Sequence, residues 1–170
     1  MKPVLMVPHF FFPAALRAAI LAMTGAAFLS GAAAVCAAEG TPDWQTNFSQ
    51  AKSLAAEQKR HVLLDFTGSD WCPWCVKMDK EVFVNREFMQ FAAKNLVLVK
   101  LDFPRSKPQP APERAQNQDL AKKYQIEGYP TYVLLDPSGN EIRRQVGYLE
   151  GGPGEFIRWT GLPKAPSGKN

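Results

Sequence analysis

Two cysteines separated by two residues, Cys72 and Cys75, are the residues of this sequence best suited to chemistry. Cysteines at this spacing can approach within disulfide geometry when a helix begins between them. Pro73 follows the first cysteine, and proline is favoured in the first turn of a helix, where its missing N–H is not needed. A sulfur at a helix start lies near unsatisfied N–H groups and the positive end of the helix dipole, which stabilise a thiolate. The pattern therefore predicts thiol–disulfide exchange.

The two sulfurs are expected to have different roles. Thiolates are the attacking species in exchange, and helix N-termini and C-x-x-C pairs lower the pKa of a thiol. Cys72 is expected to be the exposed nucleophile. Cys75, one turn into the helix, is expected to be buried and to release a mixed disulfide by attacking Cys72. No metal or organic cofactor is expected, because the electrons reside in the sulfur pair.

Three other uses of the pair are weighed against exchange. A structural zinc site takes four protein ligands, and after residue 38 His61 is the only histidine and no third cysteine follows. An inert structural disulfide is disfavoured, because closing so short a loop constrains the unfolded chain little. The third alternative is a noncatalytic soft-metal module that holds copper through Cys72, Cys75 and His61.

The first 38 residues are typical of an export signal. They contain no Asp or Glu, and Lys2 and Arg17 are their only charges. An apolar run, AAILAMTGAAFL, precedes the small residues SGAAAVCAA, which predicts a secretory signal peptide cleaved after Ala37 or Ala38. A retained membrane anchor is the alternative, but the run is short for a span. Cys36 follows a valine rather than the small residue of a lipoprotein signal, and we expect it to be removed with the signal.

The mature chain is expected to be one domain, residues 39–162, followed by a flexible polar tail, residues 163–170. With 46% hydrophobic and 21% charged residues, the composition excludes a disordered acidic chain. The net charge of +4 is too small and too scattered to indicate nucleic-acid binding. Export would place the protein in the periplasm or outside the cell, where disulfides persist. The mature form is not expected to span a membrane.

Short elements alternate along the mature chain. Apolar residues at steps of three and four predict a helix over 44–58. The runs HVLLDF at 61–66 and LVLVKLDF at 96–103 predict strands, the first of them buried on both faces. The remaining expected elements are helices over 72–82, 85–94, 113–124 and 155–160, and a hairpin of strands over 131–136 and 141–148. This order favours a small mixed α/β sheet with helices on both faces and one parallel strand pair.

The neighbours of the cysteines allow less specific interpretations. Trp71 and Trp74 flank the sulfurs and are expected to shape a substrate groove, with core packing as the alternative. Asp70 and Asp79 flank the expected helix start and are interpreted as solvated charges. Residues 104–112, PRSKPQPAP, contain four prolines and favour an ordinary long connector, with a partner contact as the alternative.

Two separated motifs resemble thioredoxin. VLLDFTGSDWCPWC is similar to its active-site strand, loop and helix, and GYPT followed by YVLLDPSGNEIRRQVGY is similar to its cis-proline segment and terminal hairpin. The resemblance runs from about residue 44 to 159, nearly the whole mature chain. TGSDWCPWCVKMDKEVF most resembles secreted thioredoxin-like proteins related to the C-terminal domain of the membrane disulfide reductase. The resemblance implies a thioredoxin-like fold.

The resemblance also implies roles for individual residues. Cys72 and Cys75 match the redox pair, Pro130 matches the cis-proline beside it, and Tyr129 matches the residue whose backbone hydrogen-bonds a substrate peptide. Asp65 matches the buried acid that assists proton transfer from the resolving thiol. The TGSD segment makes the gap from Asp65 to Cys72 one residue longer than in thioredoxin. The alternative for Asp65 is a strand acid satisfied by neighbouring N–H or Lys groups.

The family implies a protein-disulfide reductase that exchanges disulfides with protein thiol and disulfide substrates. An exported reductase cannot draw directly on cytosolic reductants, so a membrane electron-relay reductase is the implied partner. A disulfide oxidase or isomerase is the principal alternative, because reduction potentials of this fold span roughly −270 to −120 mV.

Overall fold

A computed structural model describes residues 42–164; the predicted signal peptide and residues 165–170 of the predicted tail lie outside this range. One sheet holds four strands in the order β2-β1-β3-β4: β1 (His61–Thr67), β2 (Leu96–Asp102), β3 (Thr131–Leu135) and β4 (Glu141–Val146). β1 is parallel to β2 and antiparallel to β3, and β3 forms an antiparallel hairpin with β4. The expected mixed sheet is confirmed.

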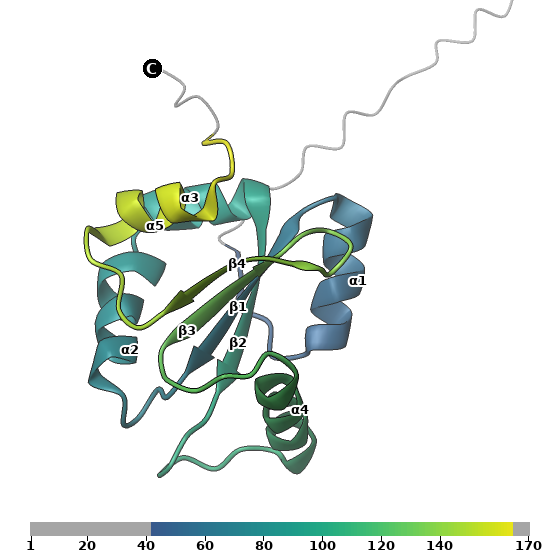
Figure 1. Cartoon of the computed structure of the whole chain (residues 1–170), viewed down its shortest axis with the longest axis vertical. Helices are drawn as coiled ribbons and strands as arrows, with labels where there is room; N and C mark the ends of the chain where they lie inside the picture. The colour runs from purple at the N-terminus through teal and green to yellow at the C-terminus, as the bar shows by residue number, and fades with distance from the viewer. Residues whose placement is uncertain (1–41, 165–170) are drawn as a thin grey trace, which may run out of the picture. The chain divides into compact units, whose positions relative to one another are not determined.

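Helices cover both faces of the sheet (Figure 1). One side carries α2 (Pro73–Met78), α3 (Arg86–Asn95) and α5 (Gly152–Thr160), and the other carries α1 (Phe48–Gln58) and α4 (Ala111–Lys123). Alternate residues of a strand point to opposite faces. Leu63 therefore joins the apolar core under α2 and α3, while Leu64 and Phe66 join the core under α1 and α4. β1 is buried from Val62 onward, as predicted for a strand covered on both faces.

The helix predicted over 44–58 begins only at Phe48, which corrects its first turn. The Asn47 side chain caps the helix by accepting the Gln50 N–H at 3.0 Å. Upstream of the cap, Gln45 makes two backbone hydrogen bonds to β2, of 2.8 and 2.9 Å. Gln45 therefore pairs with the edge strand β2, although the spacing of apolar residues places it in the helix.

The last helix begins three residues before the predicted start at 155. Gly151 stands outside the helix, as a left-handed cap with a φ of 101°, whereas Gly152 and Gly154 lie within it. Pro153 occupies the first turn, a position that favours helix initiation. A proline at this position outweighs the low helix propensity of its two glycine neighbours.

The helix predicted over 72–82 changes pitch along its length. α2 continues into a π-helical segment, η1 (Asp79–Phe83), in which Val84 N–H donates to Asp79 O at 3.1 Å. A π turn is wider than an α turn and is frequent at functional sites. Here it lets the consecutive residues Val82 and Phe83 both enter the core under α2.

The C-terminal end of the described region contacts the domain. Lys164, in the predicted flexible tail, lies with Nζ 2.7 Å from Glu87 Oε1 on α3. Both side chains are largely exposed, so this ion pair contributes little to stability. No helix within residues 42–164 combines the length and apolar character needed to cross a bilayer.

Candidate active site

A tight turn at Gly68 carries the chain from β1 to the cysteines. The backbone N–H groups of Trp71 and Cys72 both donate to Gly68 O, at 3.3 and 2.9 Å. A Cβ at Gly68 would overlap the indole ring of Trp71, so this position requires glycine.

Cys72 and Cys75 form a disulfide at the start of α2. Their Cα atoms are 5.3 Å apart, within the usual range. Cys72 is the N-cap residue, Pro73 lies in the first turn as predicted, and Cys75 N–H donates to Cys72 Sγ at 3.2 Å. An N–H donor aimed at a sulfur favours the thiolate over the thiol, so the local backbone is arranged to activate Cys72 after reduction.

The prediction that Cys72 is exposed is wrong for this disulfide-bonded state. Only 4% of Cys72 and 2% of Cys75 are accessible to solvent. The side chain of Cys72 turns inward to bond Cys75 and to accept its N–H, which leaves little of it at the surface. The predicted burial of Cys75 is confirmed.

The cis-proline segment lies against the residue that precedes Cys72. The Tyr129–Pro130 peptide is cis and Pro130 is buried, in agreement with the expectation. The Tyr129 ring meets the Trp71 ring edge-on at a centroid distance of 5.5 Å. Trp71 is itself held by a hydrogen bond from Nε1 to Phe103 O at 2.8 Å. These contacts bring Tyr129 and Trp71 together at one side of the redox pair.

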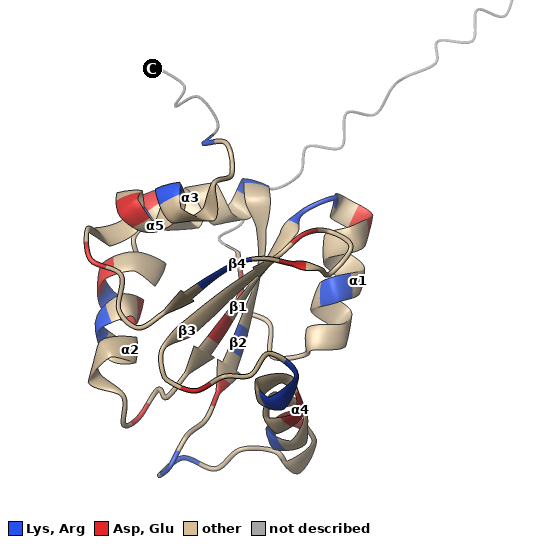
Figure 2. Ribbon diagram, viewed as in Figure 1, with Lys and Arg blue, Asp and Glu red and all other residues tan. Residues whose placement is uncertain are grey.

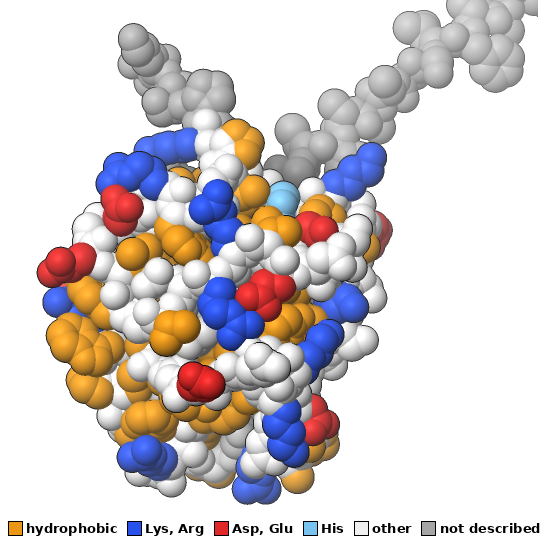
Figure 3. Space-filling view, viewed as in Figure 1, with side chains coloured by type: hydrophobic (Ala, Val, Ile, Leu, Met, Phe, Trp, Pro, Cys, Tyr) orange, Lys and Arg blue, Asp and Glu red, His pale blue; other side chains and the backbone are white. Residues whose placement is uncertain are grey.

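Trp74, between the cysteines, does not pack in the core: 53% of it is exposed. Its ring lies 5.4 Å from that of Tyr148, and Lys77 Nζ lies 4.4 Å from the Tyr148 ring centroid. The Tyr148 hydroxyl donates to Glu81 Oε2 at 2.6 Å. Exposed hydrophobic side chains gather over the α2 side of the molecule (Figure 3). This surface beside the cysteines is therefore partly aromatic.

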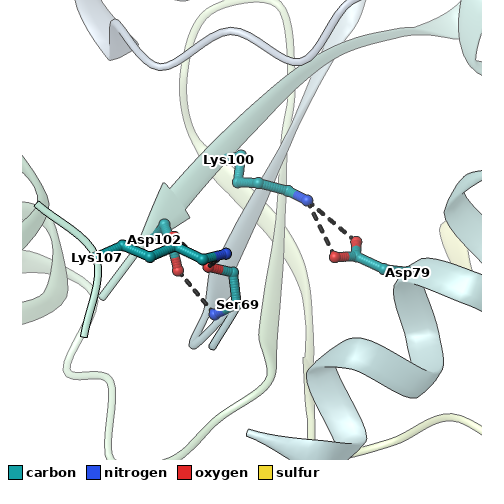
Figure 4. A network of polar contacts seen from close by, with 5 residues as sticks. All are labelled: Ser69, Asp79, Lys100, Asp102 and Lys107. Atoms are coloured by element: carbon teal, nitrogen blue, oxygen red, sulfur yellow. Dashed lines mark hydrogen bonds and ion pairs between the residues drawn. The ribbon is translucent and has the colours of Figure 1, made fainter. Parts of the chain in front are cut away.

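Asp65 lies in β1 and is 1% exposed. It stands in register with Lys100 and Tyr132, on the sheet face that α2 and η1 cover. Neither carboxylate oxygen has a hydrogen-bond partner among the described residues. Lys100 pairs instead with Asp79 of η1, with Nζ 3.1 Å from Oδ1 (Figure 4). The alternative of a strand acid satisfied by an N–H or a lysine finds no support in these contacts.

Burial raises the pKa of Asp65 to about 8. The positive charge of Lys100 opposes this rise, whereas the charges of Asp79 and Asp102 add to it. The Tyr132 hydroxyl also lacks a partner within residues 42–164, and its burial raises the pKa of the phenol. A carboxyl group whose pKa lies near 8 can accept or release a proton close to neutral pH.

Asp70 ties the loop after β2 to the loop that carries Cys72. Its carboxylate accepts three backbone N–H groups, at 3.0, 2.7 and 3.1 Å, from Arg105, Ser106 and Lys107. These bonds, led by the one from Arg105, hold the pKa of the Asp70 carboxyl below its usual range. Next to it, Asp102 accepts from Ser69 N at 2.9 Å and Oγ at 2.6 Å (Figure 4). Residues 104–112, expected to be an ordinary connector, are thus held beside the site by hydrogen bonds. The interpretation of Asp70 and Asp79 as solvated charges is wrong, because Asp70 binds this loop and Asp79 pairs with Lys100.

We expect Asp70→Ala to loosen residues 105–107, because three backbone N–H groups lose their acceptor. Hydrogen exchange followed by NMR should show faster exchange of these amides and unchanged rates in β1. The lowered pKa means that the wild-type loop stays protected until the pH falls below the usual range of an aspartate. Asp119→Ala, at an exposed position of α4, is the matched control. Equal protection of residues 105–107 in both variants would show that other contacts hold the loop.

His61 is the first residue of β1. About 20 Å of strand separate it from the loop before Cys72, so it is not a third ligand beside the cysteines. Across the described part of the chain, no three His, Cys, Asp or Glu side chains are grouped to hold a metal ion. Sequence reasoning does not find Arg105 or Tyr148, because only the folded chain brings them to Trp71 and Trp74.

Comparison with known proteins agrees with this geometry. A family model described as a thioredoxin-like domain matches residues 48–160. The disulfide bond reductase DsbH of Chlamydia pneumoniae is 34% identical over 114 residues, which cover 67% of this chain and 68% of DsbH. A solved structure titled DsbH oxidoreductase superposes with a TM-score of 0.65 at 32% identity, covering 70% of this chain and 81% of that one. The thiol:disulfide interchange protein DsbD of Actinobacillus pleuropneumoniae is 31% identical over 110 residues, which cover 64% of this chain but only 17% of DsbD.

The fold and the Cys72–Cys75 pair define a thiol–disulfide oxidoreductase. The chain belongs to the thioredoxin-like family, and the similarity to DsbH extends over about two thirds of both chains.

Proposed function

We propose that this chain is a protein-disulfide reductase that works after export, in the periplasm or outside the cell. The proposal depends most on one observation, the Cys72–Cys75 disulfide at the start of α2 with Cys75 N–H directed at Cys72 Sγ. The reducing direction is favoured by the similarity to DsbH, which is named a disulfide bond reductase. The export signal predicted in the first 38 residues supports the location.

The proposed reaction moves two electrons from the sulfur pair to a substrate disulfide. The Cys72 thiolate attacks one substrate sulfur, forms a mixed disulfide and releases the other substrate sulfur as a thiolate, which takes a proton from water. Cys75 then loses its proton and attacks Cys72 Sγ. This second step closes the Cys72–Cys75 disulfide and releases the second substrate thiol. A dithiol donor must reduce the pair again, and for an exported protein we propose a membrane electron-relay reductase.

Asp65 is the proposed acceptor of the Cys75 proton. It is buried on the sheet face that α2 covers, it has no hydrogen-bond partner among the described residues, and its pKa is raised to about 8. A base with this pKa is well matched to a thiol that must ionise near neutral pH. The unpartnered carboxylate oxygens leave room for a proton without breaking an existing hydrogen bond.

Trp71, Trp74 and Tyr129 are the proposed contact residues for a substrate polypeptide, with Pro130 shaping the Tyr129 backbone. Trp74 is exposed, and Trp71 and Tyr129 are half-buried and in ring contact. An extended substrate segment that hydrogen-bonds the Tyr129 backbone would lie next to the residue that precedes Cys72. Protein thiols and disulfides are therefore the proposed substrates.

Titration of residues 39–170 in glutathione and dithiothreitol buffers, with alkylation of free thiols as the readout, tests the proposal. We expect a single two-electron transition in which both cysteines become oxidised together. A tenfold change in the ratio of oxidised to reduced protein should then correspond to roughly 30 mV in the potential of the buffer. A reduction potential of about −270 mV agrees with a reductase, and one of about −120 mV would replace the reductase by an oxidase. Stoichiometric copper(I) binding with negligible exchange would favour the soft-metal module instead.

A further inference from the structure

Arg105 lies over the ring of Trp71, the residue immediately before Cys72. The guanidinium carbon is 3.8 Å from the ring centroid, a close cation–π contact. Both partners are held in place: Trp71 donates to Phe103 O at 2.8 Å, and Arg105 N–H donates to Asp70 Oδ1 at 3.0 Å. Hydrogen bonds therefore fix the Trp71 ring and the Arg105 backbone, and these positions favour the contact between the guanidinium and the ring.

The cationic side chains on this side of the site make no ion pair among the described residues. Arg105 and Lys107 are exposed, and neither has a carboxylate within ion-pairing distance among the described residues. The Lys107 ammonium reaches only Ser69 Oγ, at 3.4 Å. Asp70 is close and keeps its negative charge, but its carboxylate oxygens bind the three backbone N–H groups of the loop and form no ion pair with the Arg105 or Lys107 side chain. The ribbon of the loop from β2 to α4 is coloured blue, for Lys or Arg, at its tip (Figure 2).

The Trp74 side of the site differs in charge. Lys77 lies over the rings there, but its Nζ is also 3.9 Å from Glu81 Oε1. Glu81 in addition accepts the Tyr148 hydroxyl. The cation on this side thus has an ion-pair partner, whereas the Arg105 guanidinium has none among the described residues, so the two sides of the redox pair present different surfaces to a substrate.

The proposed substrate position at the cis-proline segment lies on the Trp71 side of the site. Tyr129, which precedes the cis-proline, is in ring contact with Trp71, and Trp71 is in contact with Arg105. A polypeptide laid along the Tyr129 backbone with its sulfur at Cys72 therefore has Arg105 beside the residues that flank its cysteine.

We propose that Arg105, assisted by Lys107, makes the Trp71 side of the site a docking surface for acidic polypeptide segments, so that protein disulfides flanked by Asp or Glu are the preferred substrates. This inference rests on the proposed function, because it describes which polypeptides the same redox pair takes. A carboxylate close to the guanidinium gains both a charged hydrogen bond and long-range attraction.

Two synthetic disulfide-bonded peptides that differ only in Glu or Gln beside the cysteine test the proposal. The reduced protein is mixed with each peptide, quenched with acid, and the reduced peptide is measured by chromatography to obtain a second-order rate constant. We expect the Glu peptide to react about fivefold faster, the factor for one charge pair at roughly 4 Å in water. High salt should bring the ratio of the two rate constants towards one.

Variants of the protein then show whether Arg105 causes the preference for the Glu peptide. In Arg105→Gln the ratio should fall close to one, in Arg105→Lys it should be partly kept, and in Arg114→Gln, at an exposed position of α4, it should equal that of wild type. Each ratio compares two peptides on one variant, so a general loss of activity does not imitate the effect. A wild-type ratio of one, or an unchanged ratio in Arg105→Gln, overturns the proposal.

Bis(2-hydroxyethyl) disulfide, an uncharged linear disulfide, separates failure of this inference from failure of the proposed function. If wild type exchanges with it but shows no preference for the Glu peptide, only the docking surface is rejected. If wild type reacts neither with it nor with either peptide, the proposed function is rejected and the docking surface with it.

Discussion

Cys72→Ser should abolish disulfide exchange. A thiolate is the attacking species, and a serine hydroxyl does not ionise in the same pH range. The second-order rate constant for reaction with bis(2-hydroxyethyl) disulfide should fall by more than about a thousandfold, as when the nucleophile of another covalent catalyst is removed. This linear disulfide is uncharged and small, so the measurement reports on the sulfur at the start of α2 and not on the contacts of a larger substrate.

Cys75→Ser is the matched variant, because it should stop the reaction one step later. With a disulfide that joins two separate polypeptides, Cys72 still attacks, one polypeptide leaves as a thiolate, and the other stays attached as a mixed disulfide that gel electrophoresis without reductant and mass spectrometry detect. Both variants lose the same disulfide, so any effect on folding is shared between them. Retained exchange in Cys72→Ser, or a stable mixed disulfide formed by Cys72→Ser rather than by Cys75→Ser, would contradict the assigned roles.

Asp65→Asn should remove most of the pH dependence of stability of the disulfide form. The folded pKa of Asp65 is raised from 3.8 to about 8, so between these values the folded chain holds a proton that the unfolded chain has lost. The free energy of unfolding of wild type therefore falls as pH rises through this window and levels off above it. At about 1.4 kcal/mol per pH unit, the loss is on the order of 5 kcal/mol.

The amide of Asp65→Asn does not titrate, so this variant should be more stable than wild type at the alkaline end of the window. Guanidinium unfolding at both ends measures the difference, with Asp119→Asn as a control that keeps the wild-type slope. The same variant should resolve mixed disulfides more slowly, because Cys75 loses its proton acceptor. An identical pH dependence in wild type and Asp65→Asn would mean that the carboxyl group titrates in its ordinary range.

The local sequence largely predicts the redox pair. Cys72, Pro73 and Cys75 lie within four consecutive positions, and the contacts that define the site, a helix cap and a bond across one turn, are equally local. The strands were predicted for a similar reason: an apolar run such as residues 61–66 can be buried on both sides only inside a covered sheet. Local interactions of this kind restrict the backbone conformation of the segment, whatever the rest of the fold is.

Contacts between distant parts of the chain could not be predicted in this way. Lys100 meets Asp79 across 21 positions, and Arg105 meets Trp71 only because the loop after β2 is fastened to Asp70. The burial of Cys72 and the displaced start of α1 depend equally on what packs beside them.

By itself, the sequence determined the thiol chemistry, the cap on which it depends and the order of strands and helices, because these follow from residues close together in the chain. Only the tertiary structure decided the ionisation of Asp65, the charge beside Trp71 and the accessibility of the sulfur pair. These properties depend on the distances between side chains and on how much water the surrounding elements exclude, and neither is encoded in local spacing.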